Sequence, residues 1–350
     1  MRRSELGRSY RVGIIGCGKR ARAHVPALLA DERCKVVGLA DVNIEAAAKM
    51  NADFGLDATV YTDQADLLAK EAPDVVVTCL WTPLHLPVFR DCVQAGVRAV
   101  LSEKPMAPTW GESLQIARLA EESGCLLTFC HQRRFAKGNI EARRLIEAGR
   151  FGKVLRMDLY SPPNLLDCGT HTFDQGLSLN RETPAKWALG AVDATKTLNW
   201  FNVPSEGMAA GIIVFQNGVR ANIQVGGPDA DMPTGVRVIG TEGFVEVAWD
   251  GQFGRALVYD DPAWKPPVIE DKVENHMLGV IRNALDCLES GEEPILSHKK
   301  ALRAAEIIFA LYESVRRHAR VELPLEGVTD NPFITMLQAG EFARGHKSCE

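Results

Sequence analysis

The sequence of 350 residues contains no long hydrophobic run. Its longest apolar stretches, such as residues 75–80 and 211–215, are far too short to span a bilayer. The basic N-terminus, Met1 to Arg8, is not followed by a hydrophobic segment that ends in a small-residue cleavage site. Neither a membrane partner nor a secretory route is indicated, and we expect a cytoplasmic protein.

An excess of charge of one sign is also absent. Lys and Arg number 40 and Asp and Glu number 45, a formal net charge of -5, so the composition gives no reason to expect a nucleic-acid partner. The nine cysteines form no CxxC pair. Cys17, Cys79 and Cys130 lie in or beside apolar runs, which is typical of small buried hydrophobic residues rather than of disulfide partners. No metal site is predicted.

What the sequence does contain is an alternation of short apolar runs with helical patterns in its first part. Apolar residues make up 46% of the chain, and its length suggests about two domains. The alternation is one of successive βαβ units, which implies a doubly wound parallel sheet. The predicted strands are 11–15, 36–40, 75–78, 99–101 and 125–130, and the predicted helices are 21–29, 44–50, 63–70, 85–95 and 110–123.

The pattern changes after about residue 135, where hairpin signals take over. Strand-like runs at 208–215 and 219–225 flank the turn Gln216-Asn217-Gly218, and runs at 236–239 and 244–247 flank a second turn. Consecutive hairpins imply an antiparallel sheet. Further strands are predicted at 154–160 and 256–259, and helices at 138–148, 276–289 and 300–318. We therefore predict a doubly wound domain at 1–134, a second α/β domain at 135–325 and a C-terminal extension at 326–350.

The motif Gly16-Cys17-Gly18-Lys19-Arg20-Ala21 is a GxGxxA sequence that follows the first strand and opens the first helix. Glycines there permit a tight turn and a close approach of the backbone to a pyrophosphate, which the helix N-terminus attracts. Asp41 ends the second strand about twenty residues further on, where a carboxylate accepts ribose hydroxyls. The alternative is a glycine-rich turn with a capping Asp. Asp41 favours NAD, whereas Lys19, Arg20 and Arg22 keep NADP open.

The tripeptide Glu103-Lys104-Pro105 places a lysine directly after the apolar run 99–101. Ligands bind outside the carboxyl ends of the strands in an open parallel sheet, so an amine at this edge is placed for ligand chemistry. The alternative is a solvated lysine at a strand end, and this segment by itself does not separate the two.

The segment from Asp167 to Asp174 combines a histidine with carboxylates. On a regular helix, positions 167, 171 and 174 share one face, so Asp167 and His171 would lie within reach of each other. A histidine beside an acid can serve as a general base whose tautomer the acid fixes. The alternative makes Asp167 an N-cap and His171 a surface residue. Asn164 either contacts a substrate hydroxyl or shapes the loop.

Two further segments follow predicted strands. Trp81-Thr82-Pro83 and His85 come after the strand 75–78, and His85 is either a cofactor contact or a packing or capping residue. Gln132-Arg133-Arg134 comes after the strand 125–130. There we expect one arginine to approach the nicotinamide or the substrate and the other to form a structural ion pair.

Together these motifs resemble the glucose-fructose oxidoreductase and inositol dehydrogenase (Gfo/Idh/MocA) family over nearly the whole chain. The matching elements are the GxGxxA motif, the Thr82-Pro83 turn, Glu103-Lys104-Pro105, the Asp-x-Gly-x-His segment 167–171 and the turn 240–243. The resemblance implies a Rossmann domain and an α/β domain with a large, mostly antiparallel open-faced sheet, whose exposed face often makes a homo-oligomer interface in a dimer or tetramer. It also assigns catalytic roles to Lys104, Asp167 and His171. Gln132 departs from the Asn of many relatives, which leaves the role of Arg133 open.

We therefore expect an NAD(P)-dependent dehydrogenase that transfers a hydride between nicotinamide and a hydroxyl-bearing carbon of a sugar, cyclitol or related polyol. In this hypothesis His171 takes the hydroxyl proton, Lys104 hydrogen-bonds the developing alkoxide, and Asp167 orients His171 or holds an adjacent hydroxyl. Two other classes stay open: NAD-assisted glycoside hydrolysis through transient oxidation, and a catalytically inactive, nucleotide-responsive binding protein. The predicted substrate-binding residues are Lys104, Asn164, Asp167, Thr170 and His171, and the predicted cofactor-binding residues are Gly16, Cys17, Gly18, Lys19, Arg20, Asp41, Trp81, Thr82, Pro83, His85, Glu103, Lys104 and Arg133.

Overall fold

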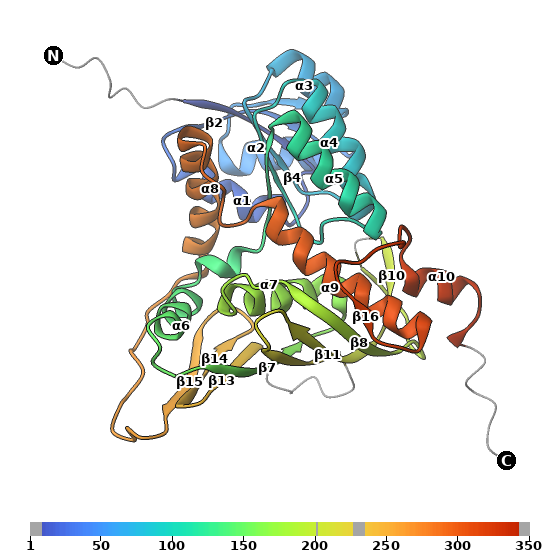
Figure 1. The fold of residues 1–350 in the computed structure, drawn as a ribbon. Coiled ribbons are helices and arrows are strands. Elements are labelled where there is room, and N and C mark those ends of the chain that lie inside the picture. The colour runs from blue at the N-terminus through green and yellow to red at the C-terminus, as the bar shows by residue number, and fades with distance from the viewer. Residues whose placement is uncertain (1–8, 201, 227–234, 343–350) are drawn as a thin grey trace. The chain divides into compact units, whose positions relative to one another are not determined.

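The computed structural model describes residues 9–200, 202–226 and 235–342 (Figure 1). The chain divides into two compact units. The first contains residues up to Lys104 together with 115–132 and 272–298, and the second contains 105–114, 133–271 and the residues from 299 onward. The basic segment Met1 to Arg8 lies outside the described residues. Among the helices that are described, none has the length and apolar character needed to cross a membrane.

The first unit is built on a parallel sheet. Its described residues form six strands in the order β3-β2-β1-β4-β5-β6, and every neighbouring pair is parallel. This arrangement confirms the predicted doubly wound sheet, and its strand order reverses between β1 and β4, where ligands bind in such folds. The strands are β1 (Tyr10–Ile15), β2 (Cys34–Ala40), β3 (Thr59–Tyr61), β4 (Val75–Thr78), β5 (Ala99–Ser102) and β6 (Leu126–Phe129).

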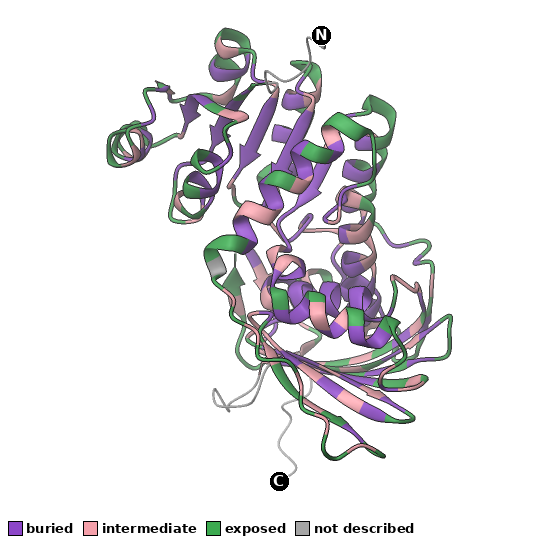
Figure 2. Ribbon diagram, turned by 90° about the vertical axis from the view of Figure 1, so that its left-hand side faces the viewer, coloured by how far each residue is buried: buried purple, intermediate pink, exposed green. Residues whose placement is uncertain are grey.

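Helices follow most of these strands. They are α1 (Ala21–Leu29), α2 (Ile44–Phe54), α3 (Gln64–Glu71), α4 (His85–Gln94) and α5 (Trp110–Ser123), with a short 3-10 turn, η1 (Thr82–Leu84), before α4. The central strands β4 and β5 are buried at every residue (Figure 2). Strands covered on both faces read as continuous apolar runs, which is why the sequence pattern finds them.

Helix α8 (Val273–Ser290) belongs to the first unit, although it follows the second sheet in sequence. Its side chains Met277, Ile281 and Leu285 are buried, and the helix packs against α1, β5 and β6. Arg33 also forms an ion pair with Asp286 of this helix at 2.7 Å. The units therefore differ from the continuous domains expected at 1–134 and 135–325. The sequence of an amphipathic helix indicates that one face is apolar, but it does not indicate which sheet that face packs against.

The second unit is built on a larger, mostly antiparallel sheet. Its described residues form eight strands in the order β15-β14-β13-β7-β12-β11-β8-β16, in which β7 and β12 run parallel and the other pairs run antiparallel. This confirms the predicted fold class. The strands are β7 (Val154–Ser161), β8 (Ala185–Asp193), β11 (Met208–Phe215), β12 (Arg220–Gly226), β13 (Gly235–Gly240), β14 (Gly243–Ala248), β15 (Phe253–Val258) and β16 (Val321–Glu322), and β9 (Leu198–Trp200) pairs with β10 (Val203–Ser205) in a small sheet.

Helices cover one face of the large sheet and leave the other face open (Figure 1). Helices α6 (Lys137–Glu147) and α7 (Thr170–Leu179) pack on β7, β13, β14 and β15, and α9 (His298–Arg317) lies over β8 and β11. A Cβ at Gly211 would lie 2.9 Å from the side chain of Leu311 on α9, and one at Gly190 would lie 3.0 Å from its carbonyl oxygen. Close packing against α9 therefore requires glycine at position 190 of β8. Because glycine lowers the strand propensity of this segment, the sequence pattern does not predict β8.

The segment after residue 325 is part of the second unit rather than a separate extension. The Asn331 side chain caps α10 (Pro332–Gln338) by accepting from the N–H groups of Phe333 and Ile334. Phe333 is fully buried, and its ring lies 5.4 Å from that of Tyr312. The expected extension at 326–350 is thus corrected for residues up to 342, and residues 343–350 lie outside the described part of the chain.

Candidate active site

The glycine loop after β1 has the backbone that its sequence requires. Gly16 has φ +87°, and a Cβ at this position would lie 2.3 Å from the carbonyl oxygen of Cys79. A Cβ at Gly18 would meet no described atom within 4 Å, so the space over the loop is open. Helix α1 begins at Ala21, directly after the loop. The loop and helix N-terminus therefore fit a pyrophosphate, which needs close backbone approach and oriented N–H groups.

Asp41 is fixed beside this loop. Its Oδ2 accepts a hydrogen bond from the N–H of Cys17 at 2.7 Å, and its Oδ1 accepts from the N–H of Asn43 at 2.8 Å. The side chain follows the last residue of β2, where a carboxylate accepts ribose hydroxyls. The loop and the acid that the sequence places apart are thus brought together, and this geometry favours the dinucleotide interpretation over a glycine-rich turn alone.

Two of the cations that kept NADP open have partners inside the protein. Arg20 Nε lies 2.6 Å from Glu103 Oε1, and Arg22 forms an ion pair with Asp53. Lys19 is exposed at the loop. A 2'-phosphate would therefore meet the Asp41 carboxylate with fewer available cations than the sequence suggests, which favours NAD.

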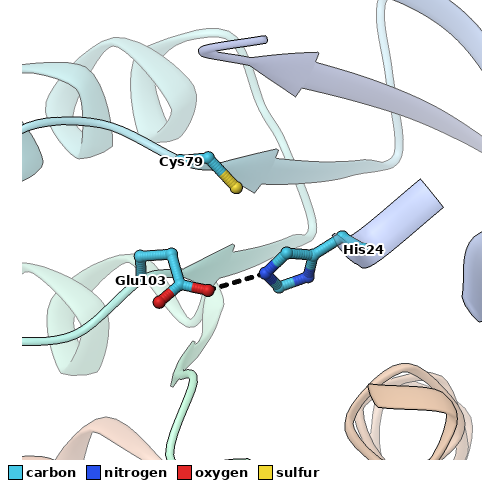
Figure 3. A group of neighbouring side chains, drawn as sticks. All are labelled: His24, Cys79 and Glu103. Carbon is cyan, nitrogen blue, oxygen red and sulfur yellow. Dashed lines mark hydrogen bonds and ion pairs between the residues drawn. The ribbon is translucent and has the colours of Figure 1, made fainter. Parts of the chain in front are cut away.

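Glu103 lies in a buried cluster, in which its carboxylate faces the ring of His24 and Cys79 lies nearby (Figure 3). The side chain is 5% exposed, and its Oε1 is 2.7 Å from Nε2 of the buried His24. Burial by itself would raise the pKa of Glu103, but the hydrogen bonds and charges of His24 and Arg20 outweigh it and lower the pKa to about 2. Sequence reasoning missed His24, whose only signal is its place one helical turn after Arg20.

Cys79 completes this cluster, since ligand atoms of His24, Cys79 and Glu103 lie within 4.8 Å of one another. Burial raises the pKa of the Cys79 thiol well above its usual range. The Arg20 guanidinium already balances the Glu103 charge and would repel a cation placed beside it. We therefore interpret the cluster as a structural ion network that fixes the residue before Lys104.

The predicted ligand residues of the first unit converge on one edge of its sheet. Lys104 is half-buried and lies two residues beyond the end of β5. Because β4 and β5 are parallel neighbours with Thr78 opposite Ser102, the Trp81-Thr82-Pro83 turn and Lys104 emerge at the same carboxyl edge. The glycine loop follows the neighbouring strand β1 at that edge. Thr82 is buried, whereas Trp81 is exposed.

His85 lies at the start of the helix that follows the Trp81-Thr82-Pro83 turn. It is buried at the first residue of α4, and its ring lies 6.3 Å from that of Phe129. Its Nε2 is 3.3 Å from the carbonyl oxygen of Leu80. These contacts fit the packing alternative for His85, and a contact of His85 with the cofactor stays a prediction.

In the second unit, the segment with Asp167 and His171 begins with a π-helical turn, η3 (Leu165–Gly169), and continues as α7. The side chain of Asn164 caps this turn, because its Oδ1 accepts from the N–H of Asp167 at 2.7 Å. Asn164, not Asp167, is therefore the N-cap. The π turn also replaces the regular helix expected through 167, and such turns occur frequently at functional sites.

The buried position of His171 contradicts the surface alternative. Asp167 is 5% exposed and His171 is 3% exposed, and Thr170 beside it is also buried. Every residue of α7 is buried, and the helix packs against α6, β7 and β13. An imidazole and a carboxylate withdrawn from water are suited to proton transfer with a bound ligand, although the sequence pattern alone left this undecided.

One of the two arginines after β6 forms a structural ion pair, as expected, whereas the approach of the other to the nicotinamide or the substrate stays a prediction. Arg134 forms a buried, two-point ion pair with Asp174, with Nε–Oδ2 and Nη2–Oδ1 distances of 2.7 Å. Asp174 therefore has a structural role. The guanidinium of Arg133 instead lies over the ring of Trp249, with its carbon 3.4 Å from the ring centroid. Trp249, which sequence reasoning missed, also meets the His171 ring edge-to-face at 6.4 Å.

Comparisons with known proteins agree with the Rossmann fold of the first unit. Residues 10–131 match the model of an oxidoreductase family with an NAD-binding Rossmann fold. The chain is 24% identical to D-apiose dehydrogenase of Paraburkholderia graminis over 361 residues, which is 96% of this chain and 95% of that protein. It is 31% identical to an inositol 2-dehydrogenase/D-chiro-inositol 3-dehydrogenase of Shouchella clausii over 149 residues, 42% of this chain and 43% of that protein.

Solved structures extend the likeness in fold to the second unit. The WlbA dehydrogenase of Bordetella pertussis, crystallised with NADH and UDP-GlcNAcA, has a TM-score of 0.76 at 22% identity and covers 91% of this chain and 100% of its own. Curated relatives at 29–32% identity are matched over 37–58% of their own length. The predicted NAD-binding Rossmann fold of an oxidoreductase family is thus confirmed for residues 10–131. The Rossmann domain, residues 10–131, matches the glucose-fructose oxidoreductase and inositol dehydrogenase (Gfo/Idh/MocA) family.

Proposed function

We propose that this chain is a dehydrogenase that transfers a hydride between NAD and a hydroxyl-bearing carbon of a sugar, cyclitol or related polyol. The observation that carries the proposal is the buried His171 on α7, four residues after the buried Asp167. Relatives that act on D-apiose and on inositols support the substrate class. NAD supplies the hydride-accepting chemistry when it is bound.

The chain's own residues have distinct roles in this reaction. His171 takes the proton of the reacting hydroxyl, and Asp167 sets the orientation of its ring or holds an adjacent hydroxyl. Lys104 hydrogen-bonds the same oxygen as negative charge develops on it. Thr170 and the Asn164 amide, whose Nδ2 is buried without a protein partner, are the proposed further contacts to substrate hydroxyls.

Cofactor recognition is assigned to the edge formed by β1, β2, β4 and β5. The loop from Gly16 to Arg20 faces the pyrophosphate and Asp41 the ribose, while Trp81, Thr82 and Pro83 border the ligand. Arg133 and Glu103 act through their partners Trp249 and Arg20 in this proposal. NAD is preferred to NADP because the Asp41 carboxylate repels a 2'-phosphate.

We also propose that the chain forms a homo-oligomer through the open face of the large sheet. Ile212 of β11 and Leu189 of β8 are paired in register and are 39% and 40% exposed, whereas the neighbouring Ile213 points toward the helices and is fully buried. Apolar side chains on an open sheet face mark an interaction surface. Light scattering should show a smaller particle for Ile212→Asp than for the control Val268→Asp, in an exposed loop. The cytoplasmic location stays a prediction.

A substrate panel tests the proposed reaction. Sugars, inositols and sugar acids are incubated with the protein and NAD or NADP, and the absorbance of the reduced cofactor is followed. We expect turnover with NAD and at least one polyol. Product formed without net NADH would instead indicate transient oxidation during glycoside cleavage. Tight NAD binding with no product across the panel would indicate an inactive binding protein.

The role of His171 is tested by substitution. His171→Ala should lower kcat by about a hundred- to ten-thousand-fold, the usual contribution of a general base, and leave NAD affinity unchanged. His318→Asn is the control, because His318 is exposed at the end of α9 and has φ +53°, which Asn tolerates. Wild-type turnover in His171→Ala would remove His171 from the mechanism.

A further inference from the structure

Glu206 is a fully buried acid that the proposed reaction does not use. It lies in the turn between β10 and β11 and is 0% exposed. Its Oε1 accepts from the N–H of Leu165 at 2.7 Å, and its Oε2 accepts from the hydroxyl of Tyr312 at 2.5 Å. The carboxylate therefore joins the small β9–β10 sheet region, the π turn η3 and helix α9 at one point. Burying a carboxylate costs free energy unless hydrogen bonds compensate for the lost water. The role of Glu206 is therefore to be sought in its bonds to Leu165 and Tyr312.

The contact with Leu165 acts at the start of the segment with Asp167 and His171. Leu165 is the first residue of the π turn, where N–H groups have no partner within the helix. Asn164 caps the N–H of Asp167 from the chain itself, and Glu206 caps the N–H of Leu165 from 41 residues away. Negative charge at a helix N-terminus is favourable. The local cap and the distant cap together hold a turn whose geometry differs from a regular helix.

The surroundings of Glu206 make its charge state sensitive to pH. Burial raises the pKa of Glu206 to about 7, and the hydrogen bonds from Tyr312 and Leu165 oppose this rise. Helix α9 presents Tyr312, the π turn presents a backbone N–H, and α10 and β9, whose sequences hold no titratable side chain, add no charge. On β8, the Oδ1 of Asp193 accepts from the N–H of Thr195, and the carbonyl oxygen of Asp193 accepts from the N–H of Gly207.

We infer that Glu206 is a positioning residue whose carboxylate holds the π turn, and through it Asp167 and His171, in the arrangement that the reaction requires. The inference rests on the proposed function. When ionised, Glu206 accepts from both donors. When protonated, it has a hydroxyl to donate, so Tyr312 must reorient to accept or Leu165 must lose its partner. The Tyr312 hydroxyl can reverse its role and accept, whereas the backbone N–H of Leu165 can only donate. Protonation therefore takes away the negative charge that strengthens the Leu165 bond, and the π turn responds to that loss.

Amide hydrogen exchange on the full chain tests whether Glu206 holds the turn. Glu206→Gln keeps the shape and removes the charge, and we expect residues 165–169 to exchange about tenfold faster, as loss of one buried charge-assisted hydrogen bond implies. Glu306→Gln is the matched control. Glu306 is on the same helix as Tyr312, its pKa is also raised by burial, and its Oε1 accepts from the N–H of Leu325 at 2.9 Å, away from the π turn. Equal acceleration at 165–169 in both variants would overturn the inference.

Kinetics separate positioning from a purely structural role. In Glu206→Gln we expect kcat to fall about tenfold with the affinity for NAD unchanged. We expect the protection of residues 165–169 in the wild type to change near pH 7, the pKa to which burial raises Glu206, and Glu206→Gln should lack this change. Faster exchange with unchanged kcat would overturn the inference. If Glu206→Gln does not fold, Tyr312→Phe replaces it, with a smaller change in the same direction expected and no local change as the overturning result. If the wild type oxidises no polyol, the proposed function fails, whereas the exchange comparison still decides whether Glu206 holds the turn.

Discussion

Nε2 of His24 lies 2.7 Å from Oε1 of Glu103, directly before Lys104 in the chain. The same oxygen is 2.6 Å from Arg20 Nε, at the start of α1. The residue that precedes the proposed catalytic lysine is therefore tied to the end of the proposed cofactor-binding loop. An ionised Glu103 therefore has a structural role, because its ion pairs fix the position of the chain between the end of β5 and Lys104.

This pair predicts an acid-dependent loss of stability. The pKa of Glu103 is lowered from 4.5 to about 2, so its stabilising contribution is complete above about pH 4.5 and is lost as the pH falls toward 2. We expect Glu103→Gln to be less stable than the wild type at pH 6, with a gap in the free energy of unfolding that shrinks by about 2 kcal/mol at pH 3. Urea denaturation at both pH values measures this gap. The exposed Glu45→Gln serves as the control, and a pH-independent gap would contradict the prediction.

We expect Asp41 to determine the preference for NAD over NADP. Asp41→Ala removes the acceptor for the ribose hydroxyls and the charge that repels a 2'-phosphate, so the Kd for NAD should rise about tenfold or more while the Kd for NADP falls. Fluorescence titration with both reduced cofactors measures the two constants. Asp66→Ala, an exposed acid on α3 paired with Lys70, should change neither constant. Equal losses for NAD and NADP in Asp41→Ala would show that Asp41 only supports the loop.

The parts of the fold that local chemistry determines are the parts that the sequence predicts. Strands β4 and β5 are continuous apolar runs, and Gly16 adopts a positive φ that side chains disfavour. Lys104 follows from the same logic, because the end of a buried parallel strand is a ligand edge. None of these inferences needs knowledge of a distant partner.

The parts that the sequence does not predict depend on distant contacts. The π turn at Leu165 is held by Glu206, 41 residues later, so a regular helix is the natural expectation from the local pattern. Helix α8 finds its apolar partner in the first unit only because the chain returns there. Trp249 gains its role from Arg133 and His171, neither of which is near it in sequence.

Trp249 predicts a change in catalysis at a residue outside the family motifs. Its ring carries the Arg133 guanidinium on one side and meets His171 edge-to-face, so Trp249→Leu should lower kcat/KM about tenfold by releasing both groups. Trp249→Phe keeps a ring face and should stay within about threefold of the wild type. Trp264→Leu is the matched control, because Arg150 lies over that ring at 5.2 Å in the same unit. Steady-state assays measure kcat/KM for each variant. An equal loss in Trp249→Leu and Trp264→Leu would contradict a specific role of Trp249.

Glu206 predicts the opposite pH dependence to Glu103. Its pKa is raised from 4.5 to about 7, so the folded state binds the proton more tightly than the unfolded state, and stability is lost as the pH rises through this range. Between pH 5 and pH 8 the free energy of unfolding of the wild type should fall by about 2 to 3 kcal/mol relative to that of Glu206→Gln, which cannot titrate. Urea denaturation at intervals across this range measures the difference. Parallel stability curves for the two proteins would show that the Glu206 carboxyl does not titrate between these limits, and the acid that anchors the π turn would then be ionised throughout.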